Sequence, residues 1–231
     1  MTTTELVNRV YNQLRDFATP YLWSDEEIII YANEAIKRMF ALVPDMMIDS
    51  TTASVCDITM VAGTRTYALS ELVLDVKSVR LAAQTAPLRR IGFSKLNLLY
   101  PTWRAMANGT PKYYCQNAVT GSVVILPPPS GSDTANMTVS RLPLTELSVA
   151  SPTAEIGFTE RYHTDLVPWI VYLCLSKRDV ETFRPDAAEQ HRQMFEKRCE
   201  EIRYELDNIK STRMTQAVPS HGMMSRMPPN A

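Results

Sequence analysis

In the first 45 residues, apolar side chains recur every three or four positions, the spacing of an amphipathic helix. A first stripe is formed by Leu6, Val7, Val10, Tyr11, Leu14 and Phe17, and it ends before Pro20. Ser24 opens a second helix, and Glu27 three residues later predicts a capping box. The expected buried face of this second helix consists of Ile28, Tyr31, Ala32, Ala35, Ile36, Met39 and Phe40. Pro44 closes it.

Between residues 51 and 144 the period changes to two, which is typical of short strands. The strand candidates are residues 55–60, 65–69, 76–82, 88–91, 112–116, 122–126 and 137–141. A short helix is expected over residues 94–100. Because no long crossover helix separates the strands, the pattern favours an antiparallel meander or a small barrel.

Helical periodicity returns after a linker at residues 148–157. The run 162–177 is apolar on nearly all sides, which places it in the middle of a group of helices. Pro168 must lie in the first turn of this helix or kink it. Asp186 opens a last long helix, whose stripe is Ala188, His191, Phe195, Cys199, Ile202, Leu206 and Ile209.

The order of elements predicts an α+β fold. Each pair of helices alone has too little apolar area, so residues 1–50 and 158–210 are expected to close into one four-helix bundle. Residues 51–147 form the inserted antiparallel β domain. Helical periodicity ends at Ser211, and residues 211–231 are predicted to be an extended C-terminal tail.

The charge balance is even, with 24 Lys and Arg against 25 Asp and Glu and a formal net charge of −1. Binding of duplex DNA by general electrostatics needs a basic excess, because it works by neutralising phosphates. The alternative of a small nucleic-acid-binding regulator would need a concentrated basic face. Arg89 and Arg90 with Lys95 are the candidate patch for it.

Reactive side chains do not cluster along the chain. The cysteines Cys56, Cys115, Cys174 and Cys199 are far apart, so we expect reduced thiols, with Cys174 and Cys199 as core residues. His163 near Asp165 fits either an acid–base pair or simply the start of a helix. Phosphate-binding glycine motifs and metal-ligand spacings are absent from the sequence. We therefore predict no catalytic residues, no metal, no cofactor and no enzymatic activity.

Two features favour contact with partner proteins. Trp103 and Arg104 stand among turn residues, and Trp and Arg are common interface anchors, although Trp103 could equally cover the edge of the β region. The tail is rich in Met and Pro, and methionines adapt well to grooves. Its candidate contact residues are Arg213, Met214, Met223, Met224, Arg226 and Met227.

This layout resembles the head-to-tail adaptor (connector) proteins of tailed bacteriophages, the larger kind with a β insert in a helical bundle. The resemblance rests on the N-terminal helix pair with its Ser-Asp-Glu-Glu entry and on the insert stretches 103–114, 124–129 and 141–143. It also rests on Tyr162-His163, followed by the apolar helix and the long charged helix from Pro185. These patterns cover most of residues 4–210.

The resemblance implies a homo-oligomeric ring, commonly of about twelve copies, in the neck of the virion. Such a ring docks under the portal, receives tail or nozzle proteins on its far side and lets DNA pass through its channel. The protein would be made in the host cytoplasm, with no membrane partner. A tail-completion or tail-tube protein of the same virion is the alternative within this class.

Overall fold

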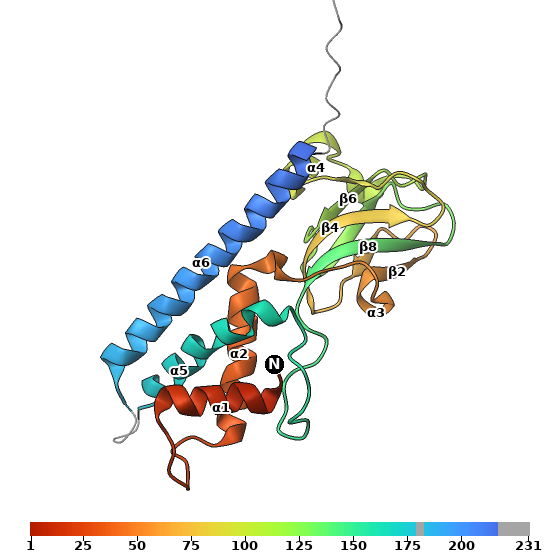
Figure 1. The fold of residues 1–231 in the computed structure, drawn as a ribbon. Coiled ribbons are helices and arrows are strands. Elements are labelled where there is room, and N and C mark those ends of the chain that lie inside the picture. The colour runs from red at the N-terminus through yellow and green to blue at the C-terminus, as the bar shows by residue number, and fades with distance from the viewer. Residues whose placement is uncertain (179–182, 217–231) are drawn as a thin grey trace, which may run out of the picture.

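The computed structural model describes residues 1–178 and 183–216. It is a mixed α+β structure in which four helices from the two ends of the chain pack together and a β-rich insert projects from them (Figure 1). The packed helices are α1 (Thr3–Leu14), α2 (Asp25–Leu42), α5 (Val167–Ser176) and α6 (Pro185–Gln216). The insert also carries two short helices, α3 (Ala53–Cys56) and α4 (Phe93–Leu99).

Helix α1 begins and ends with strong local signals. Thr2 and Glu5 form a complete capping box, which the sequence analysis did not identify. The helix stops at Leu14 because Arg15 adopts the left-handed conformation, with φ of 57°. Phe17 was expected to continue the buried stripe, but it lies beyond the helix and is largely exposed.

Helix α2 begins at the predicted position with half of the predicted capping box. The Ser24 hydroxyl accepts a hydrogen bond from the Glu27 backbone N–H at 3.2 Å. The Glu27 carboxylate instead accepts from the Tyr31 hydroxyl at 2.9 Å and pairs with Lys177 at 3.0 Å. Glu27 therefore ties α2 to the end of α5.

The apolar helix predicted in the second half of the chain is central among the four. A 3-10 helix, η3 (Glu160–Leu166), leads into α5, and Pro168 lies in the first turn of α5, where its missing N–H costs nothing. Helix α5 contacts α1, α2 and α6. Ile36 and Ile202 belong to the one core that these helices share, and the partly buried Leu14 and Leu173 pack against it.

The insert contains two small sheets. In the first, β8 (Asp133–Arg141) pairs along one edge with β1 (Ile48–Asp49) and β2 (Asp57–Met60), and along the other with β4 (Val73–Leu81). The second has the order β3 (Thr66–Ala68), β7 (Ser122–Leu126), β6 (Tyr113–Gln116), β5 (Arg89–Arg90). Buried side chains of both sheets, including Val76, Val123, Ile125 and Met137, form one core. The insert is thus two packed sheets.

The prediction of a purely antiparallel insert is wrong for one pair of strands. β5 runs parallel to β6, with Arg89 opposite Tyr113 and Arg90 opposite Tyr114. Helix α4 and a 3-10 turn, η2 (Trp103–Ala105), supply the crossover that a parallel pair requires. The strand predicted over 55–60 is also shorter, because Ala53–Cys56 forms a helical turn before β2 begins.

The last helix is longer than predicted. Helix α6 continues to Gln216, so residues 211–216 are helical and the prediction of an extended tail from Ser211 is wrong for these six positions. Helix propagation adds one hydrogen bond per residue, and the next proline is Pro219, so nothing in this stretch breaks the helix. The loss of apolar periodicity at Ser211 therefore did not mark the end of the helix.

Candidate interaction surfaces

His163 and Asp165 do not form the acid–base pair considered from the sequence. His163 is buried, and its Nε2 lies 2.8 Å from the Phe158 carbonyl oxygen. Asp165 instead accepts from Arg198 Nε at 3.2 Å. Burial raises the pKa of Asp165 despite this arginine, and burial lowers the pKa of His163. His163 thus holds η3 to the segment before it, and Asp165 holds η3 to α6.

The cysteines are core residues, as predicted for Cys174 and Cys199. All four thiols are free and buried. Burial raises the pKa of Cys174 and of Cys199 to about 12, so neither thiol is a nucleophile near neutral pH.

Within residues 1–178 and 183–216, no three His, Cys, Asp or Glu side chains come close enough together to hold a metal ion. No helix in that part of the chain has the length and apolar character needed to cross a membrane.

Trp103 lies in the interior of the insert. Its side chain is 2% exposed and packs with Leu96, Val124 and Leu126 under α4. Its indole N–H donates to Asn97 Oδ1 at 3.0 Å, so its polar atom is also satisfied. This burial favours the alternative that Trp103 covers the edge of the sheet.

Arg104 stays at the surface next to Trp103. Its guanidinium lies 4.3 Å from the centre of the Trp103 ring, a cation–π contact. The side chain is exposed and is held over the ring, so it is available to an acidic partner. Its role in binding remains a prediction.

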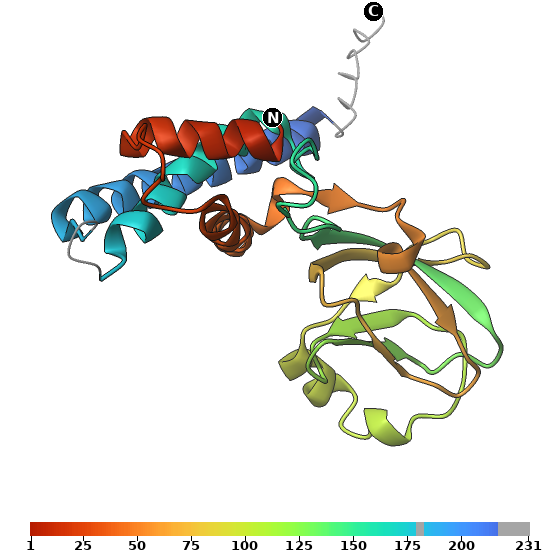
Figure 2. The same ribbon diagram turned by 90° about the horizontal axis from the view of Figure 1, so that it is seen from below.

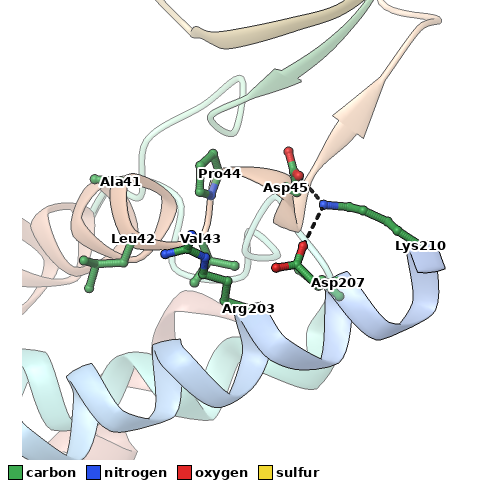
Figure 3. Close-up of a pocket in the computed structure, with 9 residues that line it drawn as sticks. Ala41, Leu42, Val43, Pro44, Asp45, Arg203, Asp207 and Lys210 are labelled. Carbon is green, nitrogen blue, oxygen red and sulfur yellow. Dashed lines mark hydrogen bonds and ion pairs between the residues drawn. The ribbon is translucent and has the colours of Figure 1, made fainter.

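A groove of about 280 Å³ lies where α6 passes the end of α2, close to the start of the insert. Figure 3 shows Lys210 reaching from α6 to Asp45 in the 3-10 turn η1 (Pro44–Met46), with Asp207 beside it. Asp45 also pairs with Lys77 of β4 at 2.5 Å. Burial works to raise the pKa of Asp45, but the two lysines outweigh it and hold the pKa below its ordinary value.

Asp45 therefore connects three parts of the molecule: the end of the α2 region, the first sheet of the insert, and α6. The network continues from Lys77 to Asp75 at 2.8 Å and from Asp75 to Arg90 at 2.7 Å. Sequence reasoning did not find this junction, because its members are up to 165 positions apart. The junction links the C-terminal part of α6 to the end of α2 and to the insert.

The tail candidates lie at or beyond the end of this helix. Arg213 and Met214 are in the last turns of α6. Met223, Met224, Arg226 and Met227 lie outside the described residues. Their proposed contacts stay predictions.

The net charge of the chain is close to zero, but positive and negative side chains are unevenly distributed along it. Residues 51–147 contain nine Lys and Arg against five Asp and Glu, a net charge of +4, which leaves 15 against 20, or −5, on the rest of the chain. Counting charges by predicted segment would have shown this from the sequence. Arg89, Arg90 and Lys95 are part of a larger basic region.

Comparison with known proteins gives a match to one protein family. The family model described as SU10 adaptor protein matches residues 1–219, nearly the whole chain. A search among curated proteins finds no match.

Proposed function

The chain belongs to the SU10 adaptor protein family, phage head-to-tail adaptors and not enzymes, and on this premise we propose that it forms a ring that joins the portal of the head to the tail. The observation that carries the proposal is the family match over residues 1–219. The ring has about twelve copies, as the family resemblance implies, and DNA passes through its channel. Tail or nozzle proteins bind its far side.

The proposed architecture assigns a task to each part of the chain. The helices of residues 1–50 and 158–210 act as one four-helix bundle, supported by the single core that α1, α2, α5 and α6 share. The insert, residues 51–147, projects from this bundle (Figure 2). A projecting part with a core of its own can contact a neighbour without disturbing the bundle.

The C-terminal segment acts as the clamp on the portal. Ordering a segment costs about 1–2 kcal/mol per residue in backbone entropy. Burial of Met223, Met224 and Met227 in a groove of the partner offsets part of this cost. Arg226 adds a charge-assisted hydrogen bond to an acidic rim. Support comes from the junction, where the Lys210–Asp45 pair holds the C-terminal part of α6, which precedes this segment in the chain, against the body.

The ring is tested by electron cryomicroscopy of purified virions and of this protein mixed with purified portal. We expect ring density between portal and tail into which the described structure fits. Density for a different protein at that position, with this chain located in the tail tube, would support the tail-protein alternative and overturn the proposal.

The clamp is tested by deleting residues 217–231, because residues 211–216 are part of α6. We expect an unchanged melting temperature and weaker attachment to the portal. A matched variant that keeps the length but replaces Met223, Met224 and Met227 with Ser separates side-chain burial from chain length. If both variants bound the portal as tightly as the full chain, the clamp would be lost and the ring proposal would stand.

A further inference from the structure

One long stretch of the insert contains no acidic residue. Between residues 76 and 132 there is no Asp or Glu, and the cations are Lys77, Arg80, Arg89, Arg90, Lys95, Arg104 and Lys112. Lys77 and Arg90 are paired with Asp75. The other five are exposed, and within the described residues none of them has an ion-pair partner. The insert therefore carries exposed positive charge that is not paired within the described residues.

Helix α4 places exposed apolar side chains beside one of these cations, Lys95. Lys95, Leu98 and Leu99 have the i, i+3, i+4 spacing that places them on one face of a helix. Leu98 is 80% exposed and Leu99 is 53% exposed, whereas Leu96 is fully buried and holds the helix on the insert. Helix α4 lies on the side of the insert turned away from the four packed helices (Figure 2). An apolar centre with a cationic rim is the composition of a protein-binding surface.

Helix α2 carries the complementary pattern. Glu26, Ile30 and Glu34 follow each other at four-residue intervals and so share one face. Ile30 is 64% exposed, and both glutamates are exposed. Neither glutamate forms an ion pair within the described part of the chain. This face offers an apolar centre with an anionic rim.

We propose that the α4 face of one copy docks on the α2 face of the next copy, with Leu98 and Leu99 against Ile30 and with Lys95 facing Glu26 or Glu34. This inference rests on the proposed ring and names the surfaces that build it. The net charges of +4 on the insert and −5 on the rest of the chain attract each other between copies. Since the two faces differ, the contact is heterologous, and repetition of such a contact closes a ring when the rotation fits.

Duplex DNA is a weaker match for the same surface. The phosphates of duplex DNA would pair with the cations of the insert. They would leave Leu98 and Leu99 in water, because contacts to phosphate are polar. The α2 face complements both the positive charge and the apolar centre of the α4 face. The partner is therefore a second copy of this chain.

The direct test is cross-linking between two variants of the full chain. A tagged Leu98→Cys variant is mixed with an untagged Ile30→Cys variant and treated with a short bismaleimide. We expect a mixed dimer in good yield. Wild type serves as a control because its four cysteines are buried. A Val119→Cys variant, exposed on the insert but outside α4, replaces Leu98→Cys in a second control and should give roughly a tenth of the yield.

Charge reversal tests the rim. Adding Lys95→Glu to the Leu98→Cys variant should lower the yield roughly five- to tenfold, and adding Glu26→Lys and Glu34→Lys to its partner should restore it. A yield no higher than that of the Val119 control, at the highest attainable concentration, overturns the proposal. The proposal is also overturned if Lys95→Glu loses duplex DNA binding and no mixed dimer forms, because the α4 face would then be a binding site for a polyanion.

The outcomes separate this inference from the ring itself. Ring density at the neck without the mixed dimer removes the α4–α2 contact and leaves the proposed function standing. The mixed dimer without ring density at the neck removes the proposed function, and the contact between copies remains.

Discussion

Arg141 Nε lies 2.7 Å from Asp49 Oδ2, and the two side chains are only 5% and 8% exposed. Asp49 is in β1, where the chain enters the insert, and Arg141 is the last residue of β8, close to where it leaves. The same carboxylate accepts from the Thr51 backbone N–H at 2.8 Å and from that of Thr52 at 3.3 Å. One buried pair thus joins the two chain crossings between helices and insert.

The Asp49→Asn substitution should lower the free energy of unfolding by roughly 3–5 kcal/mol, because it leaves the buried Arg141 charge uncompensated. Urea denaturation followed by circular dichroism measures the change. Glu71→Gln, at an exposed acid of the insert, is the matched control and should stay within about 0.5 kcal/mol of wild type. A loss below about 1 kcal/mol in Asp49→Asn would show that the pair contributes little.

The same pair makes stability depend on pH. Burial works to raise the pKa of Asp49, but hydrogen bonds from Thr52, Thr51 and Arg141 outweigh it, so the pKa lies far below its ordinary value. A carboxylate with a depressed folded-state pKa contributes stability above its unfolded pKa of about 4, and this is lost as the pH falls below that value. Denaturation midpoints from about pH 6 down to about pH 2 should therefore fall more steeply in wild type than in Asp49→Asn. If the denaturation midpoints of wild type and Asp49→Asn fell equally steeply with pH, the depressed pKa of Asp49 would be contradicted.

Trp103→Ala and Arg104→Ala should have very different effects although the residues are neighbours. Trp103 is buried, so its removal leaves a cavity and should cost roughly 3–5 kcal/mol of unfolding free energy. Arg104 is exposed and loses only its contact with the indole ring, about 0.5–1 kcal/mol. Chemical denaturation of both variants checks this. Equal losses would mean that the Trp103 side chain is not held as described.

In a fragment of residues 1–150, α1 and α2 should not fold, although the insert in the same fragment has a core of its own. This fragment lacks α5 and α6, which supply about a third of the buried residues in the core around α1 and α2. The buried Trp23 would also lose the acceptor of its indole N–H, the Cys174 carbonyl at 3.3 Å. Thermal melting and amide NMR spectra of the fragment, beside the full chain, measure the effect. A sharp melt with well-dispersed amides from α1 and α2 would contradict the shared core.

Asp45→Asn should loosen the end of α6. It removes the pairs with Lys77 and Lys210, which are partly exposed, so the loss of global stability should be only about 1 kcal/mol. Amide hydrogen exchange near residues 203–210 should become faster, and the difference from wild type should shrink in high salt, which screens such pairs. Glu146→Gln, which breaks the exposed pair with Lys37, is the control and should leave this region unchanged. Unchanged exchange in Asp45→Asn would show that the junction does not hold α6.

Local signals in the sequence were enough to find most elements. The apolar stripe and the Ser24 cap placed α2, and the turn residues around 122–126 gave β7 its correct bounds. The resemblance to phage adaptors came from the order of these elements, and the family match confirms it. Periodicity and capping act within a few residues, so a single chain displays them directly.

The tertiary structure decided everything that depends on residues far apart in the chain. The parallel pairing of β5 with β6, the burial of Trp103 and the joining of Asp49 to Arg141 have no local signature, because each depends on which surfaces meet after folding. The α4 and α2 faces are a further case. The sequence contains both patterns, but only the structure shows that packing within the chain leaves Leu98 and Ile30 exposed. Exposure is what remains after the core has formed, and no short stretch of sequence contains that information.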